Sequence, residues 1–309
     1  FLFVSFLQAI LAGFTALYVY RIGFFFMPAG WAAGTALLFS FEPLIASVHI
    51  LLMPETLYVF FATSFLYYFL AHLRNSNQRD LYSAAGMLVL AVYTKPVAMY
   101  LAVFAVLFLL PMREGLRKAA VFSSILIVLL MPWMIRNHAL AGTYAINTNG
   151  ARNFCNWGLS SVLAVKYGVD SSNWNTTVHL PEYAAVKERC TSVGRAAWIF
   201  ATEYPSSFLK MSFLSTLSLL TNEGYTVFFE KPQEEQIKAH HNFVTPAVFS
   251  NSDWREKISL AVQEFSALEL FVIMAGKLFW TFAALFAFMG MVLLVRNTKT
   301  RIPTLFLLC

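Results

Sequence analysis

Three ionisable residues lie at the ends of long apolar runs: Glu55 in MPETLYVF, Lys95 in YTKPVAMY and Arg136 in PWMIRN. A charged group at membrane depth costs about 2.5–3.5 kcal/mol on insertion scales, so such groups usually serve a function. Lysine and arginine cations bind phosphate or carboxylate groups. A glutamate can act as a base towards a hydroxyl or amine, or as a metal ligand. These residue types therefore suit chemistry on an anionic substrate.

A structural role is the alternative for Glu55 and Lys95. Glu55 follows Pro54, which suits the first turn of a helix, where the helix dipole favours a carboxylate. Lys95 could be a boundary lysine that snorkels to the lipid headgroups. However, Pro96 disfavours helical geometry at residue 95, and the apolar runs on either side of it are short. We therefore expect a hairpin whose turn is drawn into the membrane and presents Lys95 to a phosphate.

Arg136 and two asparagines complete the set of candidate substrate-binding residues. Pro132 is expected to end or kink its span, and after Trp133 the guanidinium of Arg136 could be an interfacial anchor. The alternative is bidentate pairing of Arg136 with a phosphate or carboxylate. Asn137 is the next residue. Asn153 lies in the segment NTNGARNFCNWG, which could cap a polar ligand or form a surface turn.

The composition is that of an integral membrane protein. Of the 309 residues, 59% are hydrophobic and 12% are charged, and the mean hydropathy is +0.63. A spanning helix needs about 20 apolar residues. Apolar runs near that length, or paired shorter runs, occur at 1–20, 22–41, 51–71, 81–94, 96–111, 119–135 and 266–295. These runs predict an all-α polytopic membrane protein: a transmembrane helix bundle with an external loop region that carries short helices.

Basic residues orient the predicted bundle. Nine Lys and Arg residues lie in four short loops between alternate runs, which makes these loops cytoplasmic by the positive-inside rule. We expect a bundle of six spans at 1–135, an external region at 136–265, and a C-terminal transmembrane part at 266–309. The apolar segment 206–220 is read as an interfacial or re-entrant helix, with a full span as the alternative. Because both ends of the chain lie within apolar runs, we expect it to be part of a longer protein whose first span is missing here.

Other polar clusters give weaker signals. Cys155 and Cys190 share the predicted external region, where thiols are oxidised, and either a disulfide or two free thiols would fit the sequence. His240 and His241 lie close to two glutamates, but without regular metal-ligand spacing. Asn175 begins a glycosylation tripeptide, which matters only in a secretory-pathway host.

The order of motifs resembles a known enzyme superfamily. EPLIASVHILLMPETLYVFF is followed by AAGMLVLAVYTKP, then by PWMIRNHALAGTYAINTNGARNF, and then by a helix ending in EYPSSFL. This order is similar to that of the GT-C glycosyltransferases of the protein O-mannosyltransferase and aminoarabinose transferase superfamily. The resemblance covers most of residues 1–220, and TKP followed by PWMIRN is its most specific part.

The resemblance implies a function and a set of roles. Such enzymes move a sugar, with inversion, from a polyprenyl-phosphate donor to a lipid, glycan or protein acceptor at the external membrane face. Glu55 would be a secondary acid, with the main acid upstream of Phe1. Lys95 and Arg136 would approach the donor phosphates, and Asn153 would lie near the acceptor. No cofactor is certain, and a divalent metal ion stays an open alternative.

Two further questions are left open by the sequence. The first is the class of protein: a transporter or flippase for an anionic or lipid-linked solute would also need inward-facing charges, although no internal repeat is visible. The second is the membrane. We expect the bacterial inner membrane, with the endoplasmic reticulum membrane as the alternative. No nucleic-acid partner is expected, because the basic residues are explained by topology.

Overall fold

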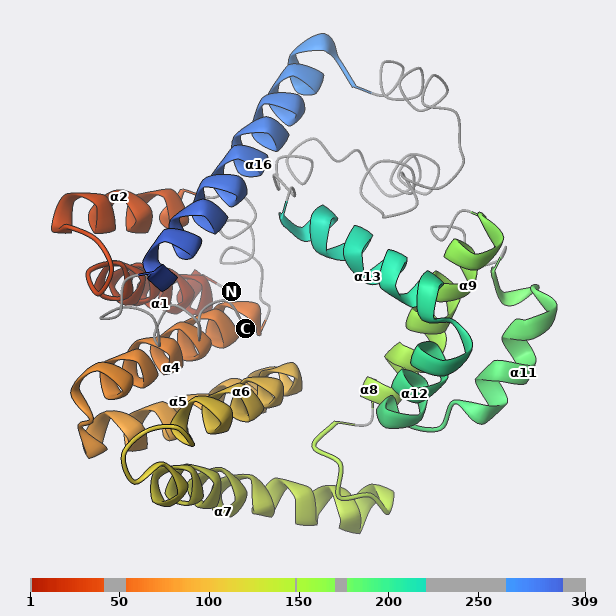
Figure 1. The fold of residues 1–309 in the computed structure, drawn as a ribbon, viewed down its shortest axis with the longest axis horizontal. Helices are drawn as coiled ribbons and strands as arrows, with labels where there is room; N and C mark the ends of the chain where they lie inside the picture. Colours follow the sequence, from red (N-terminus) through yellow and green to blue (C-terminus); the bar gives the residue numbers. More distant parts are fainter. Residues whose placement is uncertain (1, 42–53, 148, 170–176, 221–264, 297–309) are drawn as a thin grey trace. The chain divides into compact units, whose positions relative to one another are not determined.

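The fold is all-α, as predicted from the composition. A computed structural model describes residues 2–41, 54–147, 149–169, 177–220 and 265–296, and within these ranges it contains helices and no strands (Figure 1). The chain divides into two compact units. Unit 1 comprises Phe1–Ile146 and Phe286–Cys309, and unit 2 comprises Asn147–Leu285. The division between residues 146 and 147 lies eleven residues after the expected boundary between 135 and 136. A second division, between residues 285 and 286, lies within the C-terminal helix.

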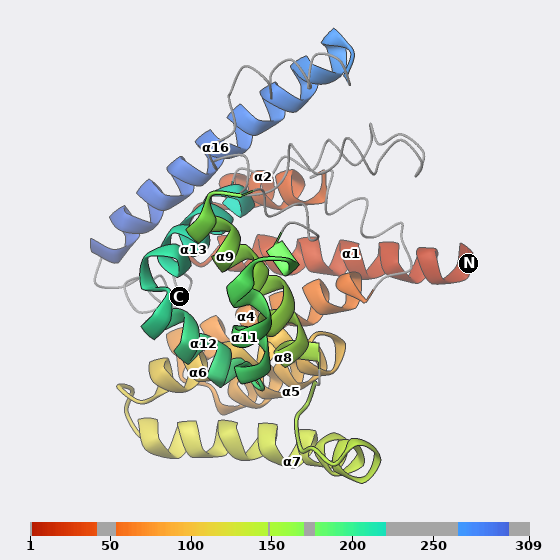
Figure 2. The same ribbon diagram turned by 90° about the vertical axis from the view of Figure 1, so that its right-hand side faces the viewer.

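Unit 1 is built from antiparallel helices that follow one another along the chain. They are α1 (Leu2–Gly23), α2 (Ala29–Ser40), α4 (Glu55–Asn75), α5 (Gln78–Thr94), the short 3₁₀ helix η1 (Pro96–Ala98), α6 (Met99–Leu109) and α7 (Gly115–Ala141). Both ribbon views show α4, α5 and α7 in successive layers (Figures 1 and 2). The core between these layers is apolar, with Phe65, Phe69, Leu88 and Phe122 fully buried. α16 (Ala267–Arg296) contributes to both units.

The first connection differs from the sequence prediction. A single apolar run was expected at 22–41, but α1 continues to Gly23 and α2 begins only after Pro28. A Cβ atom on Gly23 would lie 3.1 Å from the Cβ of Ala32, so glycine lets the end of α1 approach α2 closely. Pro28 has φ −59° and immediately precedes the first residue of α2, as its fixed φ allows.

The helix-breaking signal at Lys95-Pro96 is confirmed, whereas the one at Pro132 is not. α5 ends at Thr94, and Lys95 is extended, with φ −146° and ψ 103°, before η1 and α6. α7 instead runs through Pro132 to Ala141, where Gly142 ends it in a left-handed conformation. Arg136 and Asn137 therefore lie inside a helix and not in a loop after it.

Four helices in the described ranges are long and apolar enough to cross a membrane: Phe3–Gly23, Glu55–Asn75, Gly115–Ala141 and Ala267–Gly290. This finding agrees with the predicted polytopic membrane protein. Of the six runs expected before residue 136, three form these long helices. The other three are shorter, since α2 has 12 residues, α5 has 17, and the apolar stretch of η1 and α6 is Pro96–Leu109.

Unit 2 is a separate cluster of short helices around its own core. Its helices are α8 (Asn149–Asn153), the π-helical turn η2 (Phe154–Gly158), α9 (Leu159–Tyr167), α11 (Pro181–Arg189), α12 (Val193–Glu203) and α13 (Pro205–Leu220). Leu159, Leu163, Ile199 and Phe200 fill the core. α13 covers 16 residues, fewer than a span needs.

Candidate functional site

Glu55 and Lys95 meet at one end of unit 1. Glu55 is the first residue of α4, and Lys95 follows the last residue of α5, so the antiparallel packing of the two helices brings them together. The Lys95 ammonium donates a hydrogen bond to Glu55 Oε1 at 2.9 Å, across 40 residues of sequence. The side chains are 42% and 29% exposed respectively, so the pair is neither fully buried nor freely solvated.

The two charged groups keep unused bonding capacity. An ammonium has three donors, and Lys95 gives one of them to Glu55. The Lys95 ammonium also lies 5.7 Å from the ring centre of Tyr58, three residues along α4 from Glu55. The second carboxylate oxygen, Glu55 Oε2, is buried and has no hydrogen-bond partner within the part of the chain that the structure describes. The pair can therefore donate to an anion and accept from a hydroxyl or amine.

Arg136 lies at the same end of unit 1, held by aromatic contacts. Its guanidinium carbon lies 4.7 Å from the ring centre of Trp133, one helical turn earlier in α7. Trp133 contacts Tyr93 edge to face, at 6.1 Å between ring centres. The Tyr93 hydroxyl donates to the carbonyl of Leu129, which fixes the end of α5 against α7. Because Tyr93 is two residues before Lys95, this aromatic ladder links Arg136 to the turn that carries Lys95.

The two candidate asparagines have different surroundings. Asn137 Nδ2 donates to the carbonyl of Ala145 at 2.8 Å and to that of Ile146 at 3.3 Å. Trp133 Nε1 donates to the same Ile146 carbonyl at 3.3 Å. In the structure Asn137 thus ties the loop after α7 back onto the helix. Asn153 is exposed at the end of α8, in unit 2, whereas the other four candidate residues belong to unit 1.

A disulfide between Cys155 and Cys190 settles the pairing that the sequence left open. It joins η2 to the end of α11, and both cysteines are buried in the unit 2 core. Protein disulfides persist in oxidising compartments and are rare in the cytosol.

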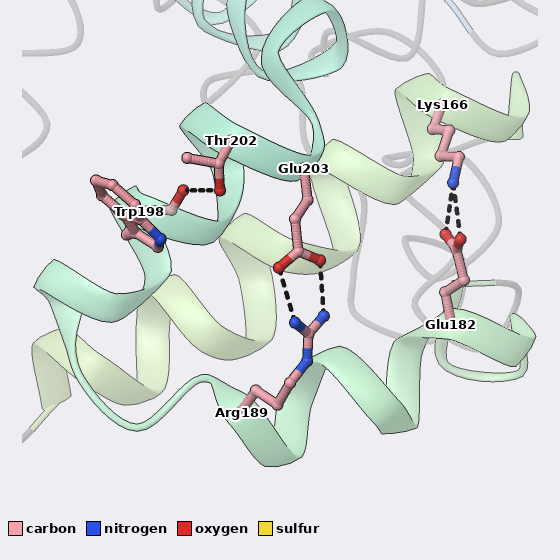
Figure 3. Close-up of polar contacts among 6 residues, drawn as sticks. All are labelled: Lys166, Glu182, Arg189, Trp198, Thr202 and Glu203. Carbon is pink, nitrogen blue, oxygen red and sulfur yellow. Dashed lines mark hydrogen bonds and ion pairs between the residues drawn. The ribbon is translucent and has the colours of Figure 1, made fainter.

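Two ion pairs hold α11 to its neighbours in unit 2 (Figure 3). Lys166 of α9 binds Glu182, and Arg189 binds Glu203 of α12 through both carboxylate oxygens, with closest distances of 2.7 Å. The hydrogen bond from Lys166 lowers the pKa of Glu182, and the bonds from Arg189 lower the pKa of Glu203. These pairs link helices of unit 2 to one another, which is a structural role.

The described ranges contain no group of three or more His, Cys, Asp or Glu side chains that could hold a metal ion. His240, His241 and the neighbouring glutamates lie outside the described residues, as does Asn175. Among the candidate site residues, Glu55 is the only carboxylate.

The fold and the charged pair define the class first: an α-helical polytopic membrane protein with paired charges at one end of its helix bundle. Residues 2–135 match the family model described as dolichyl-phosphate-mannose-protein mannosyltransferase. The match agrees with the resemblance seen in the motifs: residues 2–135, a little under half of the chain, are similar to this family of membrane glycosyltransferases. The matched range includes Glu55 and Lys95 and ends one residue before Arg136. Neither the curated proteins nor the solved structures gave a match.

Several residues at this end of unit 1 escaped the sequence reasoning. Tyr58 and Tyr93 are ordinary aromatic residues of apolar helices, and only their contacts with Lys95 and Trp133 mark them out. Gln8 and Thr56 are polar residues within apolar runs, and that property was a visible signal. Their burial beside Glu55 is described below.

Proposed function

We propose that this protein transfers a sugar from a polyprenyl-phosphate donor to a lipid, glycan or protein acceptor at the external face of its membrane, with inversion. The observation that carries the proposal is the Glu55–Lys95 pair, which lies within the residues that match the mannosyltransferase family. In this reaction the bond between the anomeric carbon and the phosphate oxygen breaks. A bond forms between that carbon and the acceptor oxygen or nitrogen, whose proton passes to a carboxylate.

Lys95 would stabilise the departing phosphate. Negative charge develops on the phosphate oxygens as the sugar leaves, and a cation already in place lowers the barrier most. Lys95 is held by Glu55 and by the ring of Tyr58, and its remaining donors are available to a phosphate oxygen. Glu55 would act as the secondary acid, with Oε2 accepting a hydrogen bond from the acceptor hydroxyl or amine.

Arg136 would contribute the second cation. Its guanidinium carbon lies over the Trp133 ring, 4.7 Å from the ring centre, and its N–H groups would meet two phosphate oxygens. The one intramolecular bond of its side chain that is seen in unit 1 is to Asn137 Oδ1, at 3.5 Å, which is long and easily exchanged. Asn137 supports this arrangement by fixing the loop after α7, and we retain Asn153 as a residue near the acceptor.

The external face is supported by two independent features. The first is the disulfide in unit 2. The second is the length of the helices: Glu55 and Arg74 are 19 residues apart in α4, as are Arg117 and Arg136 in α7. At 1.5 Å per residue each separation is about 28 Å, close to the thickness of the hydrocarbon core. With Arg74 and Arg117 on the cytoplasmic side by the positive-inside rule, the candidate site lies on the other.

The decisive experiment combines an activity assay with a topology assay on the intact protein. Purified protein in liposomes should release polyprenyl phosphate and glycosylate an acceptor when supplied with a polyprenyl-phosphate sugar. Single cysteines at residues 74 and 210 of a cysteine-free variant should react differently with an impermeant thiol reagent in intact cells. Residue 210 should react directly, and residue 74 only after permeabilisation. Labelling of residue 74 in intact cells, or solute uptake without sugar transfer, would contradict the proposal.

The membrane and the partners follow from the same reasoning. The donor is a lipid, so it reaches the site within the bilayer, and the acceptor arrives from the external side. We place the protein in the bacterial inner membrane, with the endoplasmic reticulum membrane as the alternative. The assay also tests the alternative function of a transporter, which would give solute uptake without sugar transfer. No observation within the described ranges favours that alternative.

A further inference from the structure

Two buried polar side chains lie beside the Glu55–Lys95 pair. Gln8 of α1 is 6% exposed, and Thr56, the residue after Glu55, is fully buried. Gln8 Nε2 donates a long hydrogen bond, of 3.4 Å, to Thr56 Oγ1, across 48 residues of sequence. This contact joins α1 to the first turn of α4, where Glu55 is located.

The burial of Gln8 is selective. α1 is apolar along its length, and only 11% of its most apolar window is buried. Most of the helix surface is therefore exposed within unit 1, yet two of its polar residues, Gln8 and Thr15, are buried. A side-chain amide removed from water is costly unless it is hydrogen-bonded, so an apolar residue would have been cheaper at a packing position. The position of Gln8 therefore indicates that its hydrogen bond has a purpose.

The first turn of α4 has no capping hydrogen bond from the side chain of the residue before it. The first backbone N–H groups of a helix have no partner within the helix, and a side-chain cap normally supplies one. The residue before α4 is Pro54, which provides no capping hydrogen bond. Thr56 is the second residue of α4, so a hydrogen bond from α1 to Thr56 restrains a first turn that has no side-chain cap.

We propose that Gln8 and Thr56 are positioning residues for the carboxylate of Glu55. By fixing the first turn of α4 against α1, they hold Glu55 Oε1 on Lys95 and keep Oε2 directed towards the acceptor. The part of this inference that concerns catalysis rests on the proposed function. The part that concerns the Glu55–Lys95 pair does not, because it can be measured without any substrate.

The test uses matched variants of the intact protein in detergent. Gln8→Met and Thr56→Val keep the size of each side chain and remove the hydrogen bond. Thr56→Ser keeps the hydroxyl and serves as the rescue variant. Thr15→Val is the control, because Thr15 is equally buried on α1 but its hydroxyl bonds to Leu11 of the same helix.

The first readout is the rate at which an amine-reactive reagent labels Lys95, measured by mass spectrometry of peptides. Exposed Lys210 in unit 2 serves as the internal reference. Loss of one hydrogen bond should loosen the ion pair and raise the relative labelling of Lys95 by about threefold to tenfold in Gln8→Met and Thr56→Val. Thr56→Ser and Thr15→Val should stay within about twofold of the original protein. The double variant should show less than the sum of the two single effects, because both changes remove the contact between Gln8 and Thr56.

The second readout is sugar transfer. Gln8→Met and Thr56→Val should lower kcat by about threefold to tenfold and change the KM for the donor by less than about twofold, since misplacing a carboxylate weakens the transition state and not donor binding. Unchanged Lys95 labelling in both variants would overturn the inference, and so would an equal rise in Thr15→Val. If the original protein transfers no sugar, the proposed function fails while the labelling result still decides the positioning role.

Discussion

Replacement of Lys95 by Met should separate a catalytic role from a structural one. The Glu55–Lys95 pair has a bond of 2.9 Å, and its side chains are 42% and 29% exposed. Exposed ion pairs contribute roughly 0.2–1 kcal/mol to stability, and loss of one partner of a fully buried pair costs roughly 3–5 kcal/mol. The half-exposed Glu55–Lys95 pair should therefore contribute about 1 kcal/mol to stability, close to the range for exposed pairs. The stability of Lys95→Met should therefore fall only slightly.

The expected loss of activity is much larger. Removing one preorganised donor to a developing negative charge costs about 2.7–4 kcal/mol in the barrier, or roughly a hundredfold to a thousandfold in rate. Lys166→Met is a matched control, because Lys166 also binds a glutamate, at 2.7 Å and with side chains 37% exposed. Both variants should show similar small shifts in thermal unfolding. Only Lys95→Met should lose single-turnover transfer from the polyprenyl-phosphate sugar.

The result that refutes the reasoning is equally specific. If Lys95→Met transfers sugar within about tenfold of the original rate, the loss does not exceed what an ion pair of about 1 kcal/mol explains. Lys95 would then be a structural partner of Glu55 and not a phosphate ligand. An equal loss in Lys166→Met would show that the assay reports folding. Glu55→Gln should cost less than Lys95→Met, because the amide keeps the shape and part of the hydrogen bonding.

The remaining predictions concern Arg136 and unit 2. Arg136→Ala should lower transfer by roughly a hundredfold to a thousandfold in the same assay, and a rate unchanged from the original would exclude it from the phosphate site. Replacing Cys155 and Cys190 by Ser should destabilise unit 2 by about 4 kcal/mol in chain-entropy terms, given a separation of 35 residues, as measured by denaturant unfolding. The pKa values of Glu182 and Glu203 are lowered by their basic partners. Their stabilising contribution is therefore complete above the ordinary glutamate pKa of about 4.3 and is lost as the pH falls through the lower, folded-state values. Replacing both Glu182 and Glu203 by Gln should make the unfolding midpoint depend less on pH in this acidic range. An unchanged dependence on pH would contradict the assignment.

The sequence predicted the helical membrane fold because membrane spans depend on local composition. Apolar runs and the break at Lys95-Pro96 are properties of neighbouring residues, and the structure confirms both. The start of α2 was predicted wrongly. Of the two outcomes expected at Pro132, an end or a kink of the span, the end is wrong, because α7 continues through this residue. Both depend on packing: the close approach of Gly23 to Ala32 allows the first, and a helix that continues past a proline needs tertiary support for the second.

The candidate site was predictable by residue type but not by contact. Charge at the ends of apolar runs singled out Glu55, Lys95 and Arg136, and the structure places all three at one end of unit 1. Nothing local to the sequence indicates that Lys95 binds Glu55, whereas Trp133 and Arg136, three residues apart on one helix, are neighbours by their spacing. Likewise, the chemistry of thiols left two states open for Cys155 and Cys190, and only the fold brings them together. Contacts across tens of residues are set by helix packing, which a pattern in one segment does not contain.

The extended conformation of Lys95, between α5 and η1, determines where its side chain points. Each residue added to an α-helix rotates the next side chain by about 100° around the axis. Pro96 holds Lys95 out of the helix, so α5 stops one residue before it. If residue 95 took helical φ and ψ in place of φ −146° and ψ 103°, its side chain would leave the backbone in a different direction and its contact with Glu55 would change. Pro96 thus fixes the direction of the Lys95 side chain. A substitution at position 96 would move the Lys95 ammonium although no charged residue is replaced.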